Sequence, residues 1–138
     1  MPLRPIAVLG LIAALLLVPW PSASGSELLA NGGFEAGTAP WGALDGQLDT
    51  VTSPVHGGGS AGRLTGTLLQ YHQVYQFLDV QAAQSYTFSG WVFLNDPSAV
   101  SVFLRISWFT SGGSFISQEQ SASLSFHKPE YQLITTGS

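Results

Sequence analysis

The chain has 138 residues, of which only 9% are charged, with a net charge of −4 and no cysteine. A chain of this length suits one domain. The acidic balance excludes a nucleic-acid surface built on clustered Lys and Arg, and the lack of cysteine excludes thiol catalysis and cysteine-ligated zinc. Ser, Thr, Gly and Gln supply most of the polarity, which is typical of a β-rich extracellular domain.

The first 24 residues have the pattern of an export signal. Arg4 precedes an apolar run over 6–18, a Pro-Trp-Pro break follows at 19–21, and small residues occupy 22–24. The alternative is a membrane anchor, but a spanning helix needs about 20 apolar residues and this run is shorter. We therefore expect a signal peptide over 1–24, cleavage and secretion. The remaining chain has a net charge of −5 and no basic patch for a lipid surface.

Apolar and polar residues alternate with a period of two through the rest of the chain, which predicts strands rather than helices. The expected strands are 28–30, 47–52, 63–67, 71–80, 85–95, 100–110, 115–119, a weak one at 123–126, and 131–135. A loop is expected over 32–46, and Gly- and Pro-rich turns at 53–59 and 111–114. Many short strands joined by such turns predict an all-β sandwich or jelly roll.

The three longest predicted strands carry aromatic side chains on the face opposite the expected core. These are Tyr71, Tyr75, Phe77, Trp91, Phe93, Phe103 and Phe109, with Gln73 and Arg105 among them. Sugars stack on aromatic rings and accept or donate hydrogen bonds to amide and guanidinium groups, so the pattern predicts a glycan-binding face. The alternative is that this face is core or is covered by other strands. Trp41 is a further candidate at a loop rim, its alternative being a plug for one end of the sandwich.

The run ELLANGGFEAG at 27–37, followed by Trp41, resembles the opening of a known family. The family is that of secreted carbohydrate-binding modules with a galactose-binding-like jelly roll, of the cellulose-, xylan- and laminarin-binding type. Further similar segments follow in the family's order at 56–64, 74–80, 85–92 and 131–133. The resemblance covers residues 27–138, and it implies an all-β jelly roll that binds polysaccharide.

The resemblance also implies a structural calcium ion. Calcium takes six to eight oxygen ligands, and the residues that would supply some of them are Glu35, Asn31 and Ser60. The alternative for Glu35 is a solvated carboxylate that accepts hydrogen bonds from nearby backbone N–H groups. The family continues with further strands, the last of which carries an acidic residue, so we expect the module at 27–138 to lack its C-terminal strands.

Catalytic patterns are weak in this chain. A glycosidase needs two carboxyl groups facing each other across roughly 5–10 Å, and Asp45 and Asp49 fall in a loop and a strand start with no cleft implied. Neither a His-Glu-x-x-His zinc motif nor a Gly-x-Ser-x-Gly elbow occurs. We therefore expect no enzymatic activity from this chain alone.

The sequence thus predicts a secreted module that binds polysaccharide without cleaving it. Tyr75 and Trp91 would stack on sugar rings, Gln73 and Arg105 would bind hydroxyl groups, and Phe103 and Trp41 would add contacts. One alternative is a structural or adhesive β-sandwich without sugar specificity, whose aromatics pack on neighbouring domains. The other is an accessory fragment of a larger glycoside hydrolase.

Overall fold

The computed structural model describes residues 26–66, 70–125 and 127–137. These residues form eight strands and no helix, so the prediction of an all-β chain is confirmed. The signal peptide expected over 1–24 lies outside the described residues. Within the described ranges, the search for a helix long and apolar enough to span a membrane found none.

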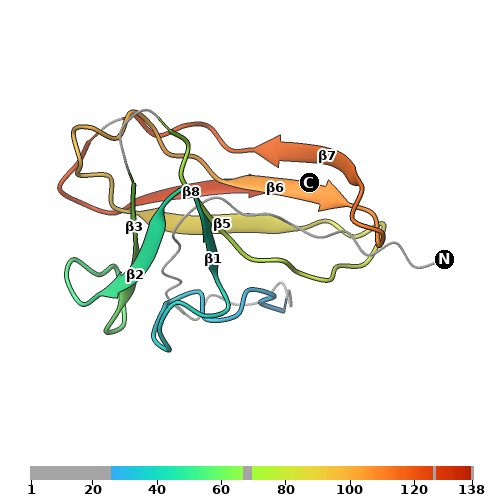
Figure 1. Ribbon diagram of the computed structural model, residues 1–138, viewed down its shortest axis with the longest axis horizontal. Helices are drawn as coiled ribbons and strands as arrows, with labels where there is room; N and C mark the ends of the chain where they lie inside the picture. The colour runs from blue at the N-terminus through green and yellow to red at the C-terminus, as the bar shows by residue number, and fades with distance from the viewer. Residues whose placement is uncertain (1–25, 67–69, 126, 138) are drawn as a thin grey trace.

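The strands pair as four antiparallel ladders of two strands each. The pairs are β1 (Gly42–Leu44) with β4 (Gln73–Tyr75), β2 (Gln47–Val51) with β3 (Ala61–Thr65), β5 (Thr87–Val92) with β8 (Gln132–Gly137), and β6 (Arg105–Phe109) with β7 (Phe115–Gln120). Strands β5 to β8 run along the long axis, whereas β1, β2 and β3 cross that direction steeply (Figure 1). Strand β8 lies close to both β6 and β7. This arrangement is consistent with a β-sandwich.

One core joins the two groups of strands. Its buried members come from the loop before β1, from β4, β5, β6 and β8 and from residues that flank them: Phe34, Trp41, Val74, Phe88, Val92, Leu94, Leu104, Ile106 and Ile134. Removing this apolar surface from water supplies the main force for folding. The core face predicted for the three long segments is confirmed at Val74, Val92 and Ile106, because side chains two residues apart in a strand share a face.

The strand predicted at 28–30 is wrong. This segment pairs with a side chain, because the Gln76 Nε2 group donates to the Ala30 carbonyl oxygen at 2.9 Å and the Ala30 N–H donates to Gln76 Oε1 at 2.8 Å. Gln76 is only 3% exposed. Its carboxamide therefore presents one donor and one acceptor to the backbone, as a neighbouring strand would.

The loop predicted over 32–46 contains strand β1, and the three long strands are shorter than predicted. Strand β4 pairs at three positions because its partner β1 has only three residues. The ladder of β6 begins at Arg105, since the Ser121 hydroxyl oxygen accepts the Leu104 N–H at 2.9 Å. The weak strand at 123–126 is reduced to one bridge between Val102 and Leu124.

The hairpin predicted at 111–114 is confirmed. The Gly113 N–H donates to the Thr110 carbonyl oxygen at 2.9 Å, and the φ angle of Gly113 is +83°. Glycine adopts this left-handed conformation without steric cost, which allows β6 to turn directly into β7.

Candidate functional site

An open groove lies over the β1–β4 ladder. Its volume is about 260 Å³, and the side chains that line it are Leu44, Gln73, Tyr75 and Phe77. In the antiparallel register Leu44 is opposite Gln73, and Gly42 is opposite Tyr75. Directly opposed side chains have Cβ atoms roughly 5 Å apart, so the register itself brings Leu44 and Gln73 together.

The Tyr75 ring lies across Gly42. A Cβ atom on Gly42 would come within 2.6 Å of Tyr75 Cζ, so only glycine leaves space for the ring in this position. The Phe77 ring meets the Tyr75 ring edge-on, with centroids 5.2 Å apart and planes inclined by 66°. Phe77 is 57% exposed. The two rings thus form an aromatic surface that is open to solvent.

Arg105 joins this site from β6. Its Nη2 group donates to Gln73 Oε1 at 3.0 Å. Within the described ranges Arg105 forms no ion pair, and its buried Nε group has no hydrogen-bond partner. The groove is therefore lined by uncharged side chains, with one unneutralised positive charge directly behind Gln73.

The structure thus brings together three of the six predicted ligand-binding residues: Gln73, Tyr75 and Arg105. Trp41 was predicted to lie at a loop rim, but it lies in the core. It is 6% exposed, its ring stacks on Phe34 with centroids 5.4 Å apart, and its indole N–H donates to the Asn31 carbonyl oxygen at 3.0 Å. The Trp41 ring therefore has no free face for a sugar, which fits the alternative of a plug.

Trp91 and Phe103 do not line the groove. Trp91 is half-buried, and His56 stacks on its ring at a centroid distance of 3.9 Å. Tyr131 packs edge-on against His56 and donates its hydroxyl hydrogen to the Pro54 carbonyl oxygen at 2.8 Å. Burial raises the pKa of the Tyr131 phenol. Phe103 is half-buried beside the Val102–Leu124 bridge, and its role as a ligand residue stays a prediction.

The residues expected around calcium lie close to one another, and some of their oxygens accept hydrogen bonds. Glu35 Oε1 accepts the N–H groups of Gly59, at 2.9 Å, and Ser60, at 3.2 Å. The Asn31 side-chain oxygen accepts the Ala36 N–H at 3.2 Å. Among the described residues no group of three or more His, Cys, Asp or Glu side chains could hold a metal ion. Glu35 would supply one carboxylate of the six to eight oxygens that calcium takes, and the calcium site stays a prediction.

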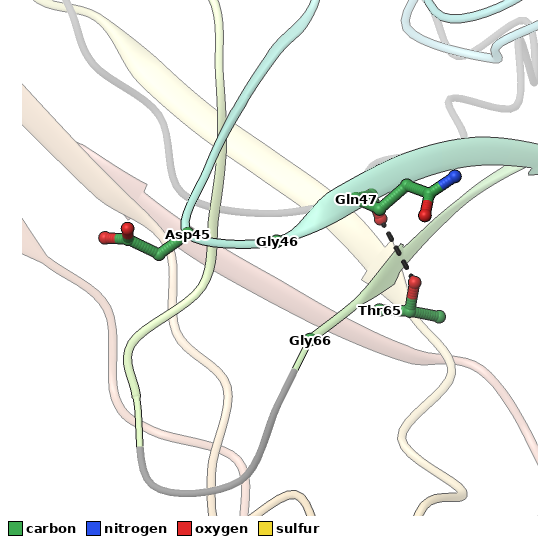
Figure 2. A pocket seen from close by; sticks show the side chains of 5 residues that line it. All are labelled: Asp45, Gly46, Gln47, Thr65 and Gly66. Carbon is green, nitrogen blue, oxygen red and sulfur yellow. Dashed lines mark hydrogen bonds between the residues drawn. The ribbon is translucent and has the colours of Figure 1, made fainter.

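A second hollow lies where β1 turns into β2. It is lined by Asp45, Gly46, Gln47, Thr65 and Gly66. Figure 2 shows the Asp45 carboxylate pointing away from the other four residues and the Thr65 hydroxyl donating to the Gln47 carbonyl oxygen, at 3.4 Å. No reactive side chains converge in this hollow, so we do not assign it a function.

Asp49, the other aspartate weighed for catalysis, forms an ion pair. The Nε and Nη2 groups of Arg63 donate to its two carboxylate oxygens at 3.0 and 2.6 Å. These hydrogen bonds lower the pKa of the Asp49 carboxyl group. Asp49 is therefore an ionised partner of Arg63, which does not suit it to donate a proton to a leaving group.

Sequence reasoning missed Leu44 as a site residue because it fell in a predicted loop. A usable signal was present, since Asp45-Gly46 is a dipeptide that favours hairpin turns and marks the residues before it as a strand end. That signal would have predicted β1 to pair with β2. In the structure β1 pairs with β4 instead, and this pairing is what places Leu44 beside Gln73.

Comparison with known proteins gives one relative. No protein-family model matches the chain, and no solved structure matches it. Exochitinase 1 of Streptomyces olivaceoviridis is 40% identical over 96 residues, which cover 64% of this chain and 15% of the exochitinase. The similarity therefore concerns a small part of that protein.

Proposed function

We propose that this chain is a secreted, non-catalytic carbohydrate-binding module with a jelly-roll fold, which attaches a larger glycoside hydrolase to its polysaccharide. The observation that carries the proposal is the groove, in which Tyr75 and Phe77 expose an aromatic surface beside the polar Gln73 side chain. Aromatic faces pack against the CH groups of sugar rings, and amide groups bind the hydroxyls.

The relative supports this proposal. A match that spans 15% of an exochitinase is what an accessory module within such an enzyme produces. The name of the relative places chitin first among the polysaccharides to be tested, followed by cellulose and xylan. Secretion and a signal peptide over 1–24 belong to the same proposal, because a polysaccharide-degrading enzyme works outside the cell.

In this proposal Tyr75 and Phe77 carry the stacking, and Gln73 carries the polar contact. Arg105 positions Gln73 and supplies a positive charge behind it. Trp91 is not given a stacking role, because His56 covers one face of its ring. Glu35 anchors the loop at 58–60 through hydrogen bonds, and no calcium step is needed for binding.

Affinity electrophoresis tests the proposal, with the whole chain run through gels that contain soluble chitin, cellulose or xylan derivatives. We expect at least one polysaccharide to retard the protein, and Phe77→Ala to remove most of that retardation. Tyr71→Ala is the matched control, since Tyr71 is 80% exposed and does not line the groove. Circular dichroism of each variant checks that it is folded.

If the folded chain migrates unretarded through every polysaccharide, the proposal is wrong. The structural or adhesive β-sandwich would then be the better interpretation, because such a spacer uses its aromatics to pack on neighbouring domains. Equal loss in Phe77→Ala and Tyr71→Ala would show that retention does not depend on the groove.

A further inference from the structure

We propose that the groove recognises the acetamido group of N-acetylated hexosamines and discriminates against sugars that carry only hydroxyl or amino groups. This inference rests on the proposed function, since it names the sugar class that the same groove selects. Its basis is the hydrogen bond between Arg105 and Gln73, together with the apolar lining around Gln73.

The hydrogen bond fixes which end of the Gln73 carboxamide is available to a ligand. A guanidinium group has only donors, so the atom at 3.0 Å from Arg105 Nη2 is the carboxamide oxygen. The amide nitrogen, Nε2, then remains, and it has no acceptor among the described residues. Gln73 therefore directs its N–H donors to whatever enters the groove, while its oxygen is bound to Arg105.

A side chain locked as a donor selects a ligand atom that accepts. A free glutamine adapts to a hydroxyl group by rotating, and the hydroxyl adapts too, because it both donates and accepts. The oxygen of an acetamido group only accepts, and it has two lone pairs. It thus suits the Gln73 N–H donors without the reorientation of a hydrogen that a hydroxyl group needs.

The remaining lining suits the methyl group of an acetamide. Leu44 stands opposite Gln73 across the ladder and is 49% exposed, so an aliphatic surface lies next to the donor. Tyr75 and Phe77 complete a wall that is almost wholly apolar. Burying hydroxyl groups against such a surface costs free energy, whereas burying a methyl group gains it.

The charge around the site argues against amino sugars and leaves uronic acids to be tested. No carboxylate lines the groove, and Arg105 is unneutralised among the described residues. A glucosamine ammonium group would meet this positive charge without a counterion. A uronic acid would be attracted to Arg105, but its carboxylate would lie against the apolar side chains of the groove.

Isothermal titration of the whole chain with four trimers tests the inference: N-acetylglucosamine, glucose joined as in cellulose, deacetylated glucosamine and a uronic acid. We expect the N-acetylated trimer to bind roughly tenfold more tightly than the glucose trimer, the size of effect that one added hydrogen bond gives. Binding of the glucosamine trimer is expected to be weakest of all in mildly acidic buffer.

Gln73→Glu is the decisive variant, because a glutamate keeps an acceptor for Arg105 but has no N–H to offer. We expect it to reduce the preference for the N-acetylated over the glucose trimer from about tenfold to about one. Gln118→Glu adds the same charge at an exposed position of β7 and is expected to leave the preference unchanged. Leu44→Ser, also at an exposed position, should reduce the preference without unfolding the chain.

The two levels of the proposal fail differently. Equal binding of the N-acetylated and glucose trimers, or tightest binding of the uronic acid, overturns acetamide recognition and leaves carbohydrate binding intact. A preference that survives in Gln73→Glu also overturns it, since the donor would then lie elsewhere. Failure of all four trimers, and of polysaccharide, to bind would remove the proposed function and this inference with it.

Discussion

The imidazole ring of His56 stacks on the indole ring of Trp91, with centroids 3.9 Å apart and planes inclined by 16°. His56 comes from the turn between β2 and β3, and Trp91 is the penultimate residue of β5. The contact therefore ties the crossing strands to the strands that run along the long axis (Figure 1). Tyr131, the residue before β8, packs edge-on against the same His56 ring.

Trp91→Ala is therefore expected to lower the free energy of unfolding and to leave most of the polysaccharide retention intact. Loss of a half-buried indole and its stacking contact should reduce the free energy of unfolding by about 2 kcal/mol. Urea denaturation measures this loss, and polysaccharide retention is measured beside it. Phe115→Ala, at a residue 57% exposed, is the control. If retention disappears while stability is unchanged, Trp91 binds sugar as the sequence predicts. The binding site would then extend beyond the groove.

The partly buried phenol of Tyr131 leads us to expect a loss of stability at alkaline pH. Burial raises the pKa of its phenol above the ordinary value of 10.0 that it regains on unfolding. The unfolded state therefore releases this proton at a lower pH than the folded state. The contribution of Tyr131 to the free energy of unfolding is fully present below pH 10.0 and declines as the pH rises towards the folded pKa. Spectrophotometric titration should show one late-ionising phenol that is absent from Tyr131→Phe. No difference between the two titrations would contradict the burial argument.

Gly62→Ala tests the packing of the N-terminal loop on β3. A Cβ atom there would lie 2.7 to 2.8 Å from three atoms of the Phe34 ring, which is fully buried. Overpacking of this kind costs about 1–3 kcal/mol, and thermal denaturation should show the loss. Gly112→Ala is the matched control, because the nearest atom to its added Cβ is Thr110 Oγ1 at 3.7 Å. Equal stability of the two variants would mean that Phe34 moves aside without cost.

Glu35 tests the calcium site that the family resemblance implies. Since its Oε1 already accepts two backbone N–H groups, we expect neither added calcium nor a chelator to shift the melting temperature. Glu35→Gln keeps an acceptor oxygen and should change stability by less than about 1 kcal/mol. A calcium-dependent rise in melting temperature that Glu35→Gln abolishes would establish the metal role instead.

Gly58 gives a second measurement on the same loop. Its φ angle is +72°, and a Cβ atom there would collide with Glu35 Oε1. Gly58→Ala is therefore expected to destabilise the chain through backbone strain and through loss of the Glu35 hydrogen bonds. The double variant with Glu35→Ala should lose less than the sum of the two single variants, because the collision no longer exists. Additive losses would show that the two residues act independently.

The alternation of residue types along the chain determined which side chains enter the core. Val74, Val92 and Ile106 were assigned correctly because strand geometry sends successive side chains to opposite faces, whatever the strand pairs with. The aromatic and amide residues of the opposite face were identified for the same reason. Turn positions such as 111–114 followed from the conformational freedom of glycine, which is also a local property.

The tertiary structure alone decided pairing, strand ends and the site. The Gln76 side chain binds the backbone of Ala30, where a strand was predicted. Strand β1 pairs with β4 across some thirty residues of sequence, and no local pattern encodes that pairing. These distant contacts buried Trp41, covered Trp91 with His56 and placed Leu44 opposite Gln73. Composition and period fix the direction of each side chain, but only the packed fold fixes which side chains it meets.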